Sequence, residues 1–316
     1  MQVGLRAGGA PGEAEEVMSR WLPVLLAQVP ARAPAIAVEA LREEVHALLA
    51  EFPATRLIVY PEYHTCDVTG GPEARRQRYE EIAEPIDGPR VNALRGIARE
   101  AGVWLVPGTV IERGSAGEIY NTAPAISPAG ELVGAYRKIF PWRPFEPFTP
   151  GDGFLVFDIP GVGRVGLCIC YDLWFPEVSR QLAWMGAEVI VCPTFTSTCD
   201  RAQELVLSRA TAIQNQVYFV AVNTATPQGT GQSIVVDPEG LVRVQAPDQS
   251  PALLTDVLDL DAVTRVRDHG TCGLNRMWSQ FKASDAALEL PVYAGSMTPE
   301  RWQFRESLAR EKKKNG

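Results

Sequence analysis

Residues 163–177 read Gly-Arg-Val-Gly-Leu-Cys-Ile-Cys-Tyr-Asp-Leu-Trp-Phe-Pro-Glu. Apolar residues alternate with small ones from Val165 to Ile169, which predicts a buried strand that ends at Cys170. Pro176 and its neighbouring glutamate then fit the first turn of a helix. Open α/β sheets place their chemistry where a strand ends beside the start of a helix, so Cys170 is a candidate nucleophile.

The composition is that of an ordinary soluble protein. With 316 residues, 46% of them hydrophobic, the chain is long enough to bury a large core. A formal net charge of −8 argues against a nucleic-acid-binding surface. No apolar run approaches the length of a membrane span and no signal peptide is evident, so we expect a cytoplasmic protein without a nucleic-acid or membrane partner.

Six cysteines are too few for a disulfide scaffold in a chain of this length, so free thiols are expected. The sequence lacks the paired Cys-x-x-Cys spacing of a zinc site, and no metal site is predicted. Cys168 and Cys192 fall on predicted buried strands and are interpreted as core residues. On strict alternation, the Cys168 side chain points to the same face as that of Cys170.

Along the chain, apolar spacing and turn residues predict elements of both kinds. Helices are expected over 17–28, 35–52, 89–101, 175–186 and 201–215. Strands are expected over 3–6, 56–62, 103–109, 187–193, 217–223 and 253–258, with hairpins over 119–136 and 232–245. The proline-rich run 139–153 is expected to be an irregular loop.

This order of strands, helices and hairpins in both halves predicts one α/β domain of two packed sheets covered by helices. The core is expected to span about 35–260, and 261–316 is expected to be a C-terminal tail at a subunit interface.

Three polar residues follow predicted strands at their carboxyl ends: Glu62, Lys138 and Cys170. Taken singly, such a glutamate is usually solvated, such a lysine lies on the surface and such a cysteine packs in the core. Three chemically complementary residues at three strand ends favour a catalytic interpretation instead.

The segments Ile-Val-Tyr-Pro-Glu62, Tyr-Arg-Lys138 and Cys-Ile-Cys170-Tyr-Asp resemble, in this order, the three motifs of the nitrilase, or carbon-nitrogen hydrolase, superfamily. The resemblance covers about residues 35–258 and implies a four-layer α-β-β-α sandwich of two packed mixed sheets. It implies a Glu62-Lys138-Cys170 catalytic triad, with Glu146 as a second glutamate beside it. No metal or organic cofactor is implied. Gln214 departs from the glutamate that many relatives carry there, which affects the subfamily assignment and not the triad.

The resemblance also implies a mechanism and a partner. Glu62 would act as the base, Cys170 would form a thioester, and Lys138 with the Tyr171 N–H would stabilise the oxyanion. Glu146 would orient the substrate or the hydrolytic water. A homodimer or larger homo-oligomer is expected, because the family commonly pairs its subunits. Residues around the triad are the candidates for substrate binding, namely Tyr63, Trp142, Tyr171, Trp174 and Thr194.

The substrate class follows from finer similarities. Tyr171-Asp172 after the cysteine and the segment Gly273-Leu-Asn-Arg-Met-Trp278 resemble the aliphatic amidase and formamidase branch. This implies hydrolysis of a small carboxamide, or a hydrazide, to the acid and ammonia or an amine. An N-carbamoyl amino acid amidohydrolase and a nitrilase are the alternatives. A catalytically silent binding protein on the same fold is a further alternative, although such a protein would be expected to have lost one of the three residues.

Overall fold

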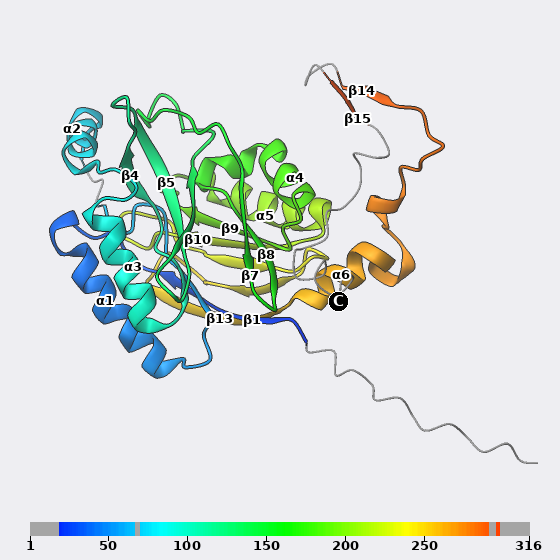
Figure 1. Cartoon of the computed structure of the whole chain (residues 1–316), viewed down its shortest axis with the longest axis horizontal. Helices are drawn as coiled ribbons and strands as arrows, with labels where there is room; N and C mark the ends of the chain where they lie inside the picture. Colours follow the sequence, from blue (N-terminus) through cyan, green and yellow to red (C-terminus); the bar gives the residue numbers. More distant parts are fainter. Residues whose placement is uncertain (1–18, 67–69, 291–294, 298–316) are drawn as a thin grey trace, which may run out of the picture.

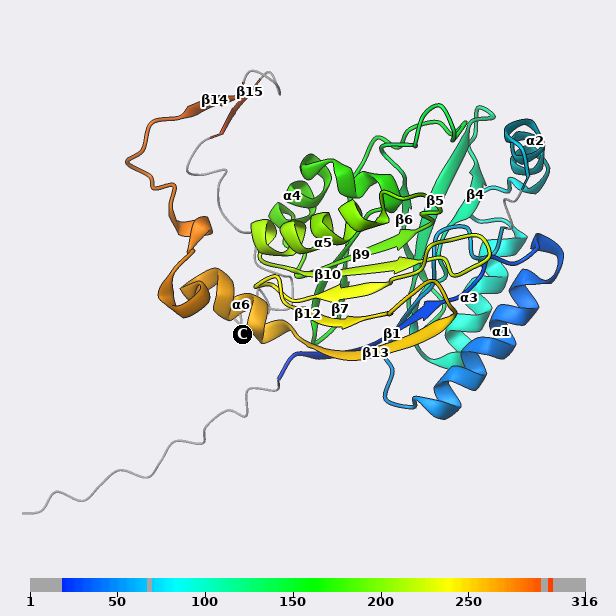
Figure 2. The same cartoon turned by 180° about the vertical axis from the view of Figure 1, so that it is seen from behind.

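The computed structural model describes residues 19–66, 70–290 and 295–297, which form two β-sheets packed face to face with helices on both outer surfaces (Figure 1, Figure 2). The long helices outside one sheet are α1 (Pro34–Glu51) and α3 (Pro89–Ala101). Those outside the other are α4 (Pro176–Trp184) and α5 (Arg201–Asn215). The predicted α/β sandwich with four layers is therefore confirmed.

The first sheet mixes parallel and antiparallel pairs. Its strands in spatial order are β13 (Ala252–Asp259), β1 (Trp21–Gln28), β2 (Leu57–Val59), β3 (Trp104–Val106), β5 (Ile119–Ile126) and β4 (Val110–Arg113), with β6 (Leu132–Arg137) also paired to β5. Because β5 runs antiparallel to both β3 and β6, the strands β2, β3 and β6 point the same way. Their carboxyl ends therefore meet at one edge.

The second sheet carries the nucleophile motif. Its strands in order are β12 (Val242–Gln245), β11 (Ile234–Val236), β10 (Tyr218–Asn223), β9 (Val189–Thr194), β8 (Gly163–Leu167) and β7 (Leu155–Ile159). The strands β8, β9 and β10 are parallel, and their short side chains and β-branched residues are buried on both faces. The remaining elements lie outside the two sheets: α2 (Pro72–Ile82), α6 (Leu260–His269), the 3₁₀ helices η1 (Cys170–Trp174), η2 (Thr271–Gly273) and η3 (Met277–Ser279), and a small pair formed by β14 (Leu288–Leu290) and β15 (Gly295–Met297).

Alternation along the strands divides the core into layers. Val24 of β1 and Val191 of β9 both point into the central cluster between the two sheets. Leu25 lies on the outer face of its sheet, where it packs against α1 and α3. On the other side, Cys192 packs outward in the cluster that contains residues of α4 and α5. None of the helices in the described part of the chain combines the length and the apolarity needed to cross a bilayer.

The helix predicted over 17–28 is wrong within the described residues, because Trp21–Gln28 forms strand β1 between β13 and β2. Both faces of this strand are buried, so its apolar residues form a continuous run without the period of two that marks a half-exposed strand. The sheet therefore begins ahead of the predicted core boundary near residue 35. The strand predicted over 3–6 lies outside the described residues.

Capping and turn residues in the sequence predicted several other elements correctly. The helix α3 begins with Pro89 at its first position and ends at Gly102, whose φ of 67° is the left-handed conformation that glycine adopts without cost. The run 139–153 has no helix or strand, as predicted. Strands β4 and β7, by contrast, were not anticipated from the sequence.

Candidate active site

The three candidate residues Glu62, Lys138 and Cys170 line one cavity, although they come from separate strand ends. Glu62 follows β2, Lys138 follows β6, and Cys170 opens η1 just after β8. The side chains of Glu62 and Lys138 are each 1% exposed, and Lys138 Nζ donates to Glu62 Oε1 at 3.0 Å. The structure therefore brings together the residues that sequence analysis singled out.

The turn that carries Glu62 is held by close backbone packing. Gly108, with a φ of 84°, lies so near that a Cβ atom there would meet the carbonyl oxygen of Pro61 at 1.9 Å. Tyr63 has a φ of 57°, and its N–H donates to the hydroxyl of Thr109 at 3.0 Å. Left-handed backbone at a residue other than glycine costs about 1 kcal/mol or more, and such strain often occurs at functional sites.

Lys138 lies between two carboxylates. Its ammonium donates to Glu146 Oε1 at 3.0 Å and Oε2 at 2.8 Å, in addition to Glu62. Glu146 also accepts hydrogen bonds from the hydroxyl of Tyr63 and, at 2.6 Å, from the backbone N–H of Trp142. Burial alone would lower the pKa of Lys138, but Glu146 and Glu62 together raise it well above its ordinary value, so the ammonium stays charged.

The two glutamates have different acidities. Burial raises the pKa of Glu62 to about 7, with Lys138 opposing the rise and the charge of Glu146 adding to it. For Glu146, burial also acts to raise the pKa, but Lys138, Tyr63 and the N–H of Trp142 outweigh it and hold the pKa below its usual value. Pairs of carboxyl groups with separated pKa values mark acid and base assignments, so Glu62 is the group suited to proton transfer near neutral pH.

Asn121, which sequence analysis did not single out, belongs to the same network. Its Nδ2 donates to Glu62 Oε1 at 2.7 Å and to the hydroxyl of Tyr63 at 2.8 Å. The residue lies on β5, opposite Ile111 of β4, and it is fully buried. A polar residue inside a predicted apolar strand was the available signal.

Cys170 lies at a sharp bend between β8 and α4. Its φ is 45°, and the bend turns its side chain toward the central core, whereas Cys168 packs outward beside Cys192. The expectation that the two thiols share a face is therefore wrong, because strand alternation stops before the bend. The interpretation of Cys168 and Cys192 as core residues is confirmed.

The setting of the Cys170 thiol favours its protonated form. Burial and the negative charge of Glu62 raise its pKa well above the ordinary value, and Lys138 opposes that rise. A nucleophilic attack by this sulfur therefore needs a group that accepts its proton, and Glu62, whose pKa of about 7 lies near neutral pH, is suited to that role.

The cavity has a volume of about 30 Å³, far below the roughly 300 Å³ or more of a drug-sized pocket. Trp142, Tyr171 and the segment Phe195–Thr198 form its walls, together with Asp200 and Glu204. Among the described residues that line it, Lys138 is the only basic one. The space suits a small uncharged group.

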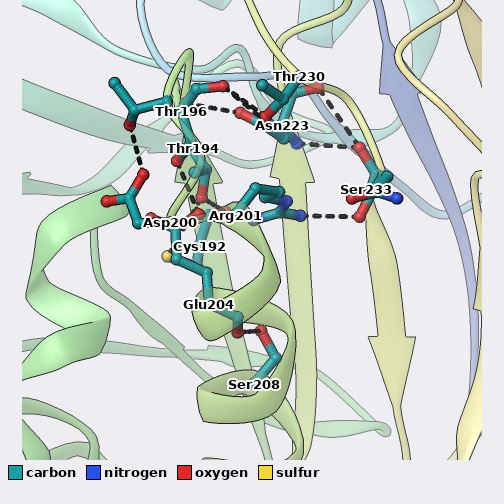
Figure 3. A network of polar contacts seen from close by, with 12 residues as sticks. Cys192, Thr194, Thr196, Asp200, Arg201, Glu204, Ser208, Asn223, Thr230 and Ser233 are labelled. Carbon is teal, nitrogen blue, oxygen red and sulfur yellow. Dashed lines mark hydrogen bonds and ion pairs between the residues drawn. The ribbon is translucent and has the colours of Figure 1, made fainter.

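The wall formed by Thr196 is clamped by a buried network that sequence analysis missed (Figure 3). The Thr196 hydroxyl donates to Glu204 Oε2 at 2.7 Å, and Arg201 Nη1 donates to the same oxygen at 3.0 Å. The Thr196 N–H donates to Asn223 Oδ1 at 2.8 Å. Arg201 also donates to the carbonyls of Gly231 and Gln232. The hydroxyl-rich run after β9 was the sequence signal for this wall.

The five candidates for substrate binding fall into different places. Trp142 and Tyr171 line the cavity. Tyr63 is buried behind Glu146 and holds it through the phenol. Trp174 and Thr194 are not among the lining residues; the Trp174 ring packs 6.1 Å from that of Tyr171, and the Thr194 hydroxyl donates to the Cys192 carbonyl at 3.0 Å.

The side chains of the described residues do not gather into a metal site. No group of three or more histidine, cysteine, aspartate and glutamate side chains in that part of the chain is arranged to hold a metal ion.

The chain is similar in sequence and in structure to known proteins. The sequence profile of the carbon-nitrogen hydrolase family matches residues 20–268. A formamidase from Bacillus thuringiensis (strain Al Hakam) is 35% identical over 206 residues, or 64% of this chain and 61% of that protein. A formamidase from Bacillus cereus (strain B4264) is 34% identical over 213 residues, or 66% of this chain and 63% of that protein. The matches thus span about three fifths of the length of these relatives.

Solved structures show the same fold. A branch 10 member of the nitrilase superfamily from Saccharomyces cerevisiae has a TM-score of 0.73 and 24% identity, covering 84% of this chain and 100% of that one. An amidase of the same superfamily from Nesterenkonia AN1 has a TM-score of 0.66 and 26% identity, covering 79% of this chain and 95% of that one.

Proposed function

Because the chain belongs to the carbon-nitrogen hydrolase family, we propose that it is a cysteine-dependent amidase that hydrolyses a small carboxamide. The observation that carries this proposal is the buried Lys138, held between Glu62 and Glu146 in the cavity that also contains Cys170. The formamidases and the amidase to which the chain is similar support the same reaction class.

The reaction begins with proton transfer. Glu62 accepts the proton of the Cys170 thiol as the sulfur attacks the carbonyl carbon of the amide. The pKa of about 7 makes Glu62 a sufficient base near neutral pH and, once protonated, a sufficient acid. Protonated Glu62 then gives its proton to the departing nitrogen, which leaves as ammonia or an amine, and Cys170 retains the acyl group as a thioester.

Two donors stabilise the oxyanion that forms during the attack. One is the Lys138 ammonium, which its two carboxylates keep charged. The other is the N–H of Tyr171, the second residue of η1, which has no acceptor within its own helix. A single well-placed donor of this kind contributes about 3 kcal/mol to transition-state stabilisation.

The second half of the reaction reverses the proton movements. Glu62 takes a proton from water as the water attacks the thioester, and it returns that proton to the departing sulfur. Glu146 stays ionised through both halves, because its pKa is held low, and it fixes the position of the Lys138 ammonium. The net reaction consumes one water and gives the carboxylic acid and ammonia.

The lining of the cavity supports a small uncharged acyl group. An anionic substrate, such as an N-carbamoyl amino acid, would need an arginine or lysine to pair with its carboxylate. Lys138 is already occupied by two glutamates, and the residues that line the cavity also include Asp200 and Glu204. Carboxamides and hydrazides are therefore favoured over carbamoyl amino acids.

A substrate panel tests the proposal. Ammonia release would be measured with aliphatic and aromatic amides, N-carbamoyl amino acids and the matching nitriles. We expect the fastest turnover with short aliphatic amides. Faster turnover of the nitriles would overturn the amidase assignment, and preference for carbamoyl amino acids would select the alternative amidohydrolase.

We further propose that the protein forms a homodimer or larger homo-oligomer, as the resemblance implied. The segment after α6 supports this, since Leu274 there is 66% exposed. Light scattering at working concentration measures the mass directly, and a monomer would refute the proposal.

A further inference from the structure

Asp172 is a buried carboxylate that takes no part in the mechanism above, yet it contacts the backbone on both sides of the active site. It is fully buried, two residues after Cys170. Its Oδ2 accepts from the N–H of Ile169 at 2.9 Å and from the hydroxyl of Tyr136 at 2.8 Å. Its Oδ1 accepts from the N–H of Phe140 at 2.9 Å.

These three donors belong to residues that lie close in sequence to Cys170 or Lys138. Ile169 directly precedes the nucleophile, whereas Tyr136 and Phe140 lie two residues before and two residues after Lys138. Tyr136 belongs to β6 of one sheet, and Ile169 follows β8 of the other (Figure 1, Figure 2). One carboxylate thus ties the lysine segment to the cysteine bend across the interface between the sheets.

We propose that Asp172 is a positioning residue that fixes the Cys170 sulfur relative to the Lys138 ammonium through these three hydrogen bonds. The proposal rests on the proposed amidase function. Apolar packing between the sheets is non-directional, so it sets their separation but not the register of two particular side chains. Directional hydrogen bonds from a buried ionised acceptor can set that register.

The chemistry of the three donors requires a carboxylate. An N–H or O–H points at each oxygen of Asp172, and an ionised carboxylate only accepts. An asparagine would turn its NH₂ group toward at least one of these donors, and two donors cannot pair. Burial raises the pKa of Asp172 to about 6, which leaves it ionised at neutral pH.

The backbone of Lys138 is also held from its own sheet, since its N–H donates to the Asn121 carbonyl at 2.9 Å. Loss of the Asp172 contacts should therefore leave Lys138 in place within its sheet and release the cysteine bend. The expected defect lies in the alignment of nucleophile and oxyanion donor, not in the existence of the cavity.

The test compares Asp172→Asn and Tyr136→Phe with Glu188→Gln as the matched control. Glu188 is also a buried carboxylate that accepts from backbone and side chain, through the N–H of Arg164 at 3.4 Å and Arg20 Nη1 at 2.8 Å. Glu188 directly precedes the first residue of β9, whereas the cavity wall formed by Phe195–Thr198 follows the last residue of that strand.

Two rates would be measured for each folded variant: kcat/KM for a short aliphatic amide, and alkylation of Cys170 by iodoacetamide, followed by mass spectrometry of its peptide. We expect Asp172→Asn to lower kcat/KM on the order of 100-fold, as small misplacements of reacting groups do. Tyr136→Phe should lower it less, and both should change the alkylation rate. Glu188→Gln should lower thermal stability and leave both rates near wild type.

Asp172→Asn or Tyr136→Phe with lower thermal stability but wild-type kcat/KM and alkylation would overturn the proposal, because only a structural role would remain. If Asp172→Asn fails to fold, Tyr136→Phe decides by the same two rates. If the wild-type protein hydrolyses no amide, the alkylation rates still test the positioning role, so failure of the proposed function is distinguishable.

Discussion

Two buried ionic clusters lie beside the same cavity, and they differ in how their charges are matched. In the first, the Lys138 ammonium serves both Glu62 and Glu146, and Glu62 has a pKa of about 7. In the second, Arg201 divides its donors among Glu204 and two backbone carbonyls (Figure 3).

This difference indicates a catalytic role for the first cluster and a structural role for the second. A carboxyl group with a pKa near the working pH can gain and lose a proton at little cost, which is what a general base needs. A guanidinium whose planar fork is bound to fixed acceptors holds its neighbours in place. We therefore expect changes in the first cluster to alter turnover, and changes in the second to alter stability.

The largest effect is expected from the nucleophile next to the first cluster. Cys170→Ala should lower kcat by about a million-fold, as loss of a covalent nucleophile does. Cys168→Ala is the matched control, because that thiol packs on the outer side of the sheet and should leave turnover largely intact. Ammonia release by the two purified variants decides between these outcomes, and an active Cys170→Ala protein would remove the basis of the mechanism.

Within the first cluster, Glu62→Gln and Lys138→Ala should each collapse turnover without unfolding the protein. A fall of about 1,000-fold is expected for Glu62→Gln, since the amide cannot accept the thiol proton. Circular dichroism recorded beside activity checks both parts of this expectation. Loss of the folded spectrum in both variants would show that these residues are structural.

The pH dependence of kcat/KM provides a further test of the first cluster. Below about pH 7, Glu62 becomes protonated and can no longer accept a proton from the thiol. The value of kcat/KM should therefore fall about tenfold for each pH unit below that pKa. A profile that stays flat from pH 7 to pH 5, with the protein still folded, would contradict the role of Glu62 as base.

The smallest effect on turnover is expected from the second cluster. Arg201→Met removes a buried charge and leaves Glu204 without its ion partner, which should lower the free energy of unfolding by about 3 kcal/mol. The folded fraction should keep kcat within about tenfold of wild type, since Arg201 does not line the cavity. Urea unfolding and activity per folded molecule measure the two quantities, and unchanged stability with collapsed turnover would reverse the comparison.

The sequence allowed the first cluster to be predicted and hid the second for a physical reason. Glu62 and Lys138 follow predicted strands within segments that resemble motifs of the carbon-nitrogen hydrolase family, and the same resemblance implied Glu146. Thr196 and Glu204 lie on separate elements, and their pairing depends on how α5 packs against the end of β9. Such a tertiary contact has no periodic signal in the chain.

Two of the differences between the predicted and the observed structure have related causes. Strand β1 is buried on both faces, so a continuous apolar run was taken for a helix. The orientation of Cys168 relative to Cys170 was misjudged because alternation was extended through a residue with a φ of 45°. In both places the packing around the residues, and not their local pattern, determined the backbone.

The proposed mechanism requires that the sulfur of Cys170 carries the acyl group during turnover. Wild-type protein would be mixed with a short aliphatic amide, quenched in acid during turnover, digested and analysed by mass spectrometry. We predict an acyl increment on the peptide that contains Cys170, removed by hydroxylamine as expected for a thioester and absent from Cys170→Ala. Rapid ammonia release by the wild-type protein together with an acyl group on a different residue would contradict the account.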